Sequence, residues 1–183
     1  NIIFLILIFS FFIVLFFLLL YLAPDRFDYI ISRITSFMDP EKSGWSQSQK
    51  AIEAIQQGGL KGRGMGEGIL KENVPEAHTD YIIAVVSEEF GSAVSVLIII
   101  IFLFVAFRII KKVINFSSNF YKLSLSGLVS LLIFQTFIHV GVNANLLPTT
   151  GMTLPFLSYG GSSIIGSSIL AGIILNLTKK NIN

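Results

Sequence analysis

Residues 2–22 read IIFLILIFSFFIVLFFLLLYL, an apolar run in which Ser10 is the single polar residue. A helix needs about 20 largely apolar residues to cross the ~30 Å hydrocarbon core of a bilayer, so this run predicts a membrane span at residues 1–22. The alternative is a secretory signal peptide, whose apolar region is only about 7–15 residues long and follows a basic start. This run is longer and has no basic start.

The composition of the whole chain also indicates that lipid is its solvent. The 183 residues are 53% apolar and 13% aromatic, and the mean hydropathy is +0.77. The absence of cysteine excludes disulfides, thiolate metal sites and a cysteine nucleophile. His78 and His139 are the only histidines, so we do not expect a histidine-based metal site.

Three further apolar stretches predict membrane spans at residues 81–108, 121–146 and 163–178. We therefore expect an all-α, polytopic transmembrane protein with about four spans in this chain. The chain opens with Asn rather than Met, so we also expect it to be the later part of a longer protein.

The second predicted span has a short apolar centre, residues 93–107. Its helix must therefore reach back to Glu88 and Glu89, which we expect at the membrane surface or facing the protein interior. A helix continuous to Arg108 would place Asp80 about 12 Å above the hydrocarbon edge.

The distribution of charge orients these spans. All eleven acidic residues fall between Asp25 and Glu89. The connection at residues 109–120, with the residues that flank it, and the tail at 179–183 contain basic residues and no acidic ones. By the positive-inside rule, the connection and the tail are cytoplasmic. The loops at 23–80 and 147–162 are then extracytoplasmic.

The long external loop contains two local patterns. Apolar residues at helical spacing over Phe27–Phe37 predict an amphipathic helix on the membrane surface. The run Gly58–Gly68 then predicts a break in regular structure and a flexible loop. It fails the dinucleotide-binding fingerprint, because Glu67 stands where the third glycine belongs and no strand precedes it. Lys61 and Arg63 within the run are phosphate contacts or solvated loop charges, and the pattern leaves both readings open.

Two sets of polar residues are associated with the predicted spans. Asp80 lies at the start of the second, where it either complements the helix dipole or serves a functional role. In the third span, Gln135, His139 and Asn143 recur every four residues and form one polar stripe. Such a stripe favours hydrogen bonds between helices, with a translocation path as the alternative.

Four stretches carry a resemblance to a known family, in the same order and spacing. They are Gly58–Gly66 (GGLKGRGMG), Pro75–Ile82 (PEAHTDYI), Glu88–Gly91 (EEFG) and Leu147–Ser163 (LPTTGMTLPFLSYGGSS). Together they resemble the SEDS family, named for shape, elongation, division and sporulation, over residues 24–178. The sequence around Glu67 and Asp80 looks most like that of the cell-division branch.

The resemblance implies a peptidoglycan glycosyltransferase, of which this chain resembles only the C-terminal half. Such enzymes polymerise the lipid-linked precursor lipid II into undecaprenyl-linked glycan at the outer face of the bacterial cytoplasmic membrane. The division branch implies a location at the septum, with a class B penicillin-binding transpeptidase and other division proteins as partners, and no nucleic acid.

The resemblance also implies roles for individual residues. The family's essential acid maps onto Asp80, which we expect to be the general base for the acceptor sugar's 4-hydroxyl. Lys61 or Arg63, with a divalent cation such as Mg²⁺ or Mn²⁺, is expected to neutralise the leaving pyrophosphate. The remaining expected substrate-binding residues are Glu76, His78, Thr79, Gln135 and Ser158.

Two other functions remain open. A lipid II flippase would use the polar stripe of the third span as its path, and a non-catalytic scaffold would hold division proteins together. The chain departs from many relatives at His139, where they have Asn, and at Thr150, where some have Lys.

Overall fold

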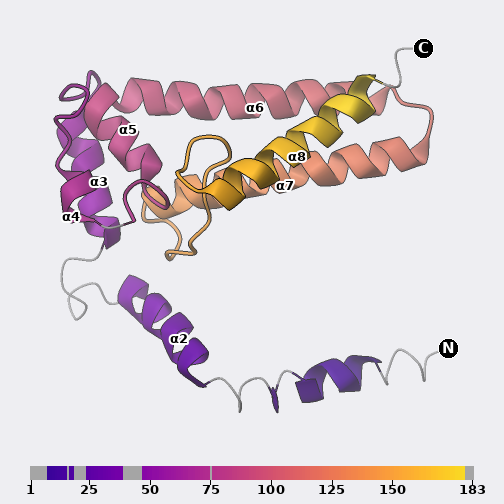
Figure 1. Ribbon diagram of the computed structural model, residues 1–183, viewed down its shortest axis with the longest axis horizontal. Helices are drawn as coiled ribbons and strands as arrows, with labels where there is room; N and C mark the ends of the chain where they lie inside the picture. Colours follow the sequence, from indigo (N-terminus) through magenta and orange to yellow (C-terminus); the bar gives the residue numbers. More distant parts are fainter. Residues whose placement is uncertain (1–7, 16, 19–23, 39–46, 75, 180–183) are drawn as a thin grey trace. The chain divides into compact units, whose positions relative to one another are not determined.

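The computed structural model describes residues 8–15, 17–18, 24–38, 47–74 and 76–179 (Figure 1). The chain divides into two compact units, Asn1–Gly44 and Trp45–Asn183. Every described element is a helix, so the expected all-α class is confirmed for the described residues.

The first unit contains a helical stretch at residues 8–15 and 17–18, followed by helix α2, Pro24–Met38. The remainder of the predicted first span lies outside the described residues. Helix α2 starts at a proline, whose fixed φ suits a first helical turn. The helix predicted over Phe27–Phe37 is thus confirmed, while its position on the membrane surface stays a prediction.

The second unit contains six helices among its described residues. They are α3 (Gln47–Gly58), α4 (Leu70–Asn73), α5 (Ile82–Phe90), α6 (Ser92–Ile114), α7 (Asn119–Asn143) and α8 (Gly161–Lys179). The last three are long and apolar enough to cross a membrane. Figure 1 shows α6 running alongside α7, with α8 lying across α7.

A small core joins the three long helices, and the rest of their surface is apolar and exposed. The core contains Ala106 of α6, Leu125 and Val129 of α7, and Ile174 of α8. Many large apolar side chains on the same helices point outward, such as Phe107 and Leu175. An apolar outer surface is what a helix presents to lipid, so the chain is a multi-pass membrane protein.

The second span differs from its predicted bounds, because the helix breaks at Gly91. This residue has φ 93° and ψ 156°, a conformation that L side chains rarely adopt and glycine adopts readily. Helix α6 then continues beyond Arg108 to Ile114, since lysine and arginine stems can lie along apolar surface while their charges reach water. Its 23 residues suffice to cross a membrane without α5.

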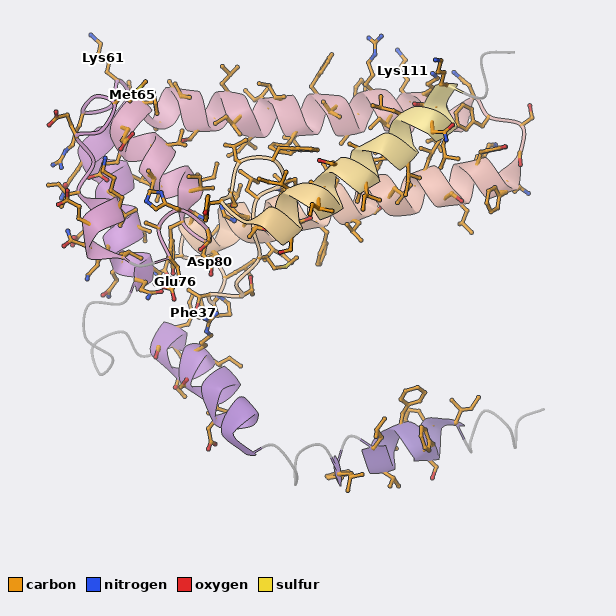
Figure 2. The ribbon with its side chains drawn as sticks, viewed as in Figure 1. Phe37, Lys61, Met65, Glu76, Asp80 and Lys111 are labelled. Atoms are coloured by element: carbon orange, nitrogen blue, oxygen red, sulfur yellow. The ribbon has the colours of Figure 1, made fainter. Side chains whose placement is uncertain are left out.

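The break folds α5 back along α6. The hydroxyls of Ser87 and Ser95 lie 2.7 Å apart, and the Ser95 hydroxyl also donates to the Ile83 carbonyl at 3.4 Å. Asp80 therefore does not continue the line of α6, but lies near the end of α7 that carries Asn143 (Figure 2). The expected height of about 12 Å above the hydrocarbon edge assumed one continuous helix, and that assumption was wrong.

Candidate active site

The glycine-rich segment packs directly onto the break between α5 and α6. A Cβ on Gly58 would lie 2.0 Å from the Ser87 carbonyl oxygen, and one on Gly62 would lie 2.3 Å from that of Glu89. A Cβ on Gly91 would lie 2.2 Å from the Leu60 carbonyl oxygen. The two backbones thus touch, and no larger residue fits at these three positions.

This packing satisfies the helix ends at the break. Arg63 and Gly64 donate their backbone N–H groups to the carbonyls of Glu88 and Glu89, at 2.9 and 3.0 Å. Ser92, at the start of α6, donates its backbone N–H to the Gly59 carbonyl at 2.8 Å. Helix ends leave such groups without partners inside the helix. The glycine run does lack regular structure, as predicted. However, its backbone packs against the break between α5 and α6 and bonds to it, so it is not the flexible loop that we expected.

Glu88 is the buried anchor of the same segment. Its side chain is 1% exposed and accepts hydrogen bonds from the backbone N–H groups of Ile69 and Leu70, at 2.9 and 3.0 Å. Arg63 pairs with it at 3.4 Å. Of the two positions expected for Glu88, the protein interior is the one observed.

Asp80 ends a tight turn that leads into α5. Its backbone N–H donates to the Glu76 carbonyl at 2.9 Å, and the Thr79 hydroxyl donates to the same carbonyl at 3.1 Å. The Glu76 and His78 side chains are exposed, whereas Thr79 and Asp80 are half-buried. Figure 2 shows Glu76 and Asp80 close together at one end of α5.

Asn143 of α7 fixes both Asp80 and the start of α5. Its side-chain amide donates to the Asp80 carbonyl at 2.9 Å, and its side-chain oxygen accepts from the Ala84 N–H at 3.0 Å. Tyr81, at the N-cap of α5, provides no side-chain cap. Asn143 therefore supplies from another helix the acceptor that an N-cap residue would supply locally.

The loop between α7 and α8 is held against the same region. His139 donates from Nδ1 to the Met152 carbonyl at 2.8 Å, because a carbonyl oxygen can only accept. Gln135 donates to the Thr153 carbonyl at 2.9 Å. The loop then passes the carboxylate: a Cβ on Gly151 would lie 3.9 Å from Oδ2 of Asp80.

The loop also holds the turn before Asp80. Ser158 is 1% exposed, and its hydroxyl donates to the Thr79 carbonyl at 2.7 Å while accepting from the Leu154 N–H at 2.8 Å. The next residue, Tyr159, donates its backbone N–H to the His78 carbonyl at 2.9 Å. The carboxylate of Asp80 is thus presented from a backbone that α7 and this loop hold.

The structure gathers most of the predicted site residues, but not all. Glu76, His78, Thr79 and Ser158 surround the Asp80 backbone. Gln135 lies two helical turns from Asn143 and binds the loop instead. Lys61 lies at the opposite end of α5 from Asp80 (Figure 2), and nine helical residues span about 14 Å. Arg63 lies at that far end too, because its partner Glu88 does.

Sequence reasoning missed the roles of Asn143 and Glu88 in this arrangement. The four-residue period of the polar stripe was the visible signal for Asn143, and it correctly indicated hydrogen bonding. However, two of the three stripe residues bind loop carbonyls and not another helix.

A metal site does not emerge from these side chains. Within the described ranges, no group of three or more His, Cys, Asp or Glu side chains could hold a metal ion. We therefore assign no chemical step to a divalent cation.

Comparison with known proteins now identifies the family. A family model described as cell cycle protein, covering FtsW, RodA and SpoVE, matches residues 1–183. The chain belongs to this family. A relative named probable peptidoglycan glycosyltransferase FtsW, from Caulobacter vibrioides, is 42% identical over 154 residues, covering 84% of this chain and 40% of the relative. One of the same name from Nitrosomonas europaea is 41% identical over 168 residues, covering 90% of this chain and 43% of the relative.

A solved structure shares the fold of this FtsW/RodA/SpoVE member. It belongs to a peptidoglycan synthase complex that coordinates polymerisation and crosslinking. The TM-score is 0.65 at 23% identity, covering 97% of this chain and 49% of that chain. This chain thus spans about half or less of the proteins that it matches.

Proposed function

We propose that this chain is the part of a peptidoglycan glycosyltransferase that carries the catalytic base, and that the enzyme polymerises lipid II into glycan strands during cell division. The observation that carries the proposal is the placement of Asp80. Asp80 is half-buried, while its backbone is held by Asn143 and the adjacent residues by Ser158 and Tyr159. The names of the relatives supply the reaction.

In the proposed reaction, Asp80 removes the proton from the 4-hydroxyl of the acceptor sugar. The hydroxyl oxygen attacks the anomeric carbon of the growing strand, and the bond from that carbon to the pyrophosphate oxygen breaks. Undecaprenyl pyrophosphate leaves with the bonding electron pair. General-base catalysis of this kind contributes about 10²–10⁴-fold when the base is held within hydrogen-bond reach, which is why the fixed backbone at residues 78–80 supports this role.

In this proposal, neither Lys61 nor Arg63 neutralises the charge of the leaving pyrophosphate. Arg63 pairs with Glu88, and both cations lie about one α5 length from Asp80, roughly 14 Å. The nucleophile and the leaving group sit on opposite sides of one carbon atom, so a cation acting on the pyrophosphate must lie closer than that. Glu76 and His78, whose exposed side chains flank the turn, are proposed to contact the substrate.

The partners and the location follow from the same proposal. A glycosyltransferase of the division branch would act at the septum of the bacterial cytoplasmic membrane. It would work with a class B penicillin-binding transpeptidase and other division proteins. The similar structure comes from a complex that joins polymerisation to crosslinking, and this supports the pairing.

A flippase is the second candidate, and the structure offers it less support. A translocation path needs polar side chains that can exchange partners with a moving head group. Gln135, His139 and Asn143 instead bind backbone groups of this chain at 2.8–3.0 Å.

The test uses this chain together with the N-terminal spans of a relative, reconstituted in liposomes with lipid II supplied on the external face. The proposal predicts glycan polymer, seen as a ladder of lengths. A flippase would instead make fluorescent lipid II inaccessible to an external quencher without polymer. Neither polymer nor flipping, with partner binding intact, would indicate a scaffold and contradict the proposal.

A further inference from the structure

Tyr159 combines an exposed ring with a fixed backbone. Its side chain is 78% exposed, although the preceding residue, Ser158, is 1% exposed. Its N–H donates to the His78 carbonyl at 2.9 Å, and the Ser158 hydroxyl donates to the Thr79 carbonyl at 2.7 Å. These two bonds tie Tyr159 to the backbone immediately before Asp80.

The turn to which the Tyr159 backbone is bonded carries polar and exposed side chains. Glu76 and His78 are exposed on the same turn, and Gly151, beside the Asp80 carboxylate, is exposed as well. The ring therefore offers an exposed flat apolar face and a hydroxyl on a residue whose backbone is bonded to the turn that carries Asp80. A tyrosine ring typically buries its apolar body against a partner while its hydroxyl makes a hydrogen bond.

A pyranose ring has the matching chemistry. One face of the sugar presents C–H groups that can lie on an aromatic ring, and its rim presents hydroxyls that carboxylates and phenols can bind. We propose that Tyr159 binds the acceptor sugar by stacking on its pyranose ring, and so holds the hydroxyl of that sugar at Asp80. This inference rests on the proposed function, since it names the contact that orients the acceptor.

A membrane-interface role is the competing explanation, because tyrosine is enriched where membrane meets water. The two roles make different demands on the side chain. Stacking on a sugar requires an aromatic ring and affects the affinity for a saccharide. Anchoring at the interface affects stability in a bilayer and leaves that affinity unchanged.

The experiment measures binding of lipid II in an Asp80→Asn background, in which binding is separated from turnover. The assembled protein in nanodiscs is titrated with lipid II for variants Tyr159→Phe, Tyr159→Trp and Tyr159→Leu. Loss of the ring in Tyr159→Leu should weaken binding about tenfold, equivalent to ~1.4 kcal/mol. Phe and Trp should keep the affinity within about threefold, because they keep the aromatic face.

Phe156→Leu is the matched control, since Phe156 is also an exposed aromatic residue of this loop, at 49% exposure. It should leave the affinity unchanged. Unchanged affinity in Tyr159→Leu would overturn the inference, and a fall in its thermal midpoint only in nanodiscs would assign the residue to the membrane interface. The proposed function fails separately: it is overturned if Asp80→Asn alone still makes polymer at the normal rate, whatever the titrations show.

Discussion

At the scale of single residues, Asn143 illustrates how far the sequence can predict the site. Its membership of a polar stripe was readable, because the four-residue period of α7 is a local property. Its partners were not, since Ala84 and Asp80 lie 59 and 63 residues away along the chain. Which backbone groups meet a side chain over such separations depends on the whole fold.

Replacing Asn143 with leucine should both destabilise the protein and slow the reaction. The change leaves the Ala84 N–H and the Asp80 carbonyl without their buried partner, which costs about 1–3 kcal/mol for each group. We expect a free energy of unfolding lower by about 2–6 kcal/mol and a polymerisation rate reduced more than about tenfold. Denaturant unfolding in micelles and a lipid II assay measure the two effects.

Asn176→Leu is the control for that change, because Asn176 is exposed on α8. It should change the free energy of unfolding by no more than about 0.5 kcal/mol and leave the polymerisation rate unchanged. Equal behaviour of the two variants would refute the role given to Asn143.

Phe156 and Asn145 form a reciprocal pair of backbone tests. Both have positive φ, 65° and 53°, which costs most L residues about 1–2 kcal/mol but is tolerated by asparagine. Phe156→Asn should therefore raise the free energy of unfolding by about 1 kcal/mol, and Asn145→Ala should lower it by a similar amount. If thermal unfolding shows that both variants are more stable than the unmodified protein, or that both are less stable, then backbone strain does not determine the effect of these two substitutions.

At the scale of elements, the decisive feature is the break between α5 and α6. Hydropathy predicted one span over residues 81–108, because it does not distinguish Gly91 from any other small residue on the face of a helix. Only the crossing of two backbones requires glycine there, and that crossing involves the segment from Gly58 to Gly64, about thirty residues earlier. The break turns α5 away from the line of α6, so that Asp80 meets Asn143 of α7.

Gly58→Ala should disrupt this crossing. The new methyl group would lie 2.0 Å from the Ser87 carbonyl oxygen, and neither backbone can yield easily. We expect a loss of about 1–3 kcal/mol of stability. Gly127→Ala on α7, where a Cβ meets nothing within 4 Å, should instead be neutral or stabilising by up to about 1 kcal/mol. Thermal midpoints measured side by side distinguish the two, and a harmless Gly58→Ala would contradict the packing described.

At the scale of the whole molecule, the sequence predicted most of the architecture. The helical class and the later apolar helices were readable, because hydropathy is a local quantity. The predicted third and fourth spans, 121–146 and 163–178, differ from α7 and α8 by only a few residues at each end. The arrangement of the segments before α5 and between α7 and α8 was not readable, since it depends on hydrogen bonds between distant segments.

The predicted orientation can be tested by labelling. Lys61 and Lys111 lie at opposite ends of α6 in Figure 2, and the chain contains no cysteine. A membrane-impermeant maleimide should label Lys61→Cys in intact spheroplasts, and should label Lys111→Cys only after the membrane is permeabilised. The reverse pattern would invert the topology and move Asp80 to the side without lipid-linked acceptor strands.

The role of Asp80 is tested most directly by the rate of glycan polymerisation of Asp80→Asn, measured with lipid II binding in the same preparation. The amide keeps the shape of the side chain and leaves the backbone bond to Asn143 in place, but it cannot accept the proton. We expect a rate lower by about 10²–10⁴-fold, with the affinity for lipid II within a factor of about three of the unmodified protein's. A rate equal to that of the unmodified protein would contradict the assignment of Asp80 as the base.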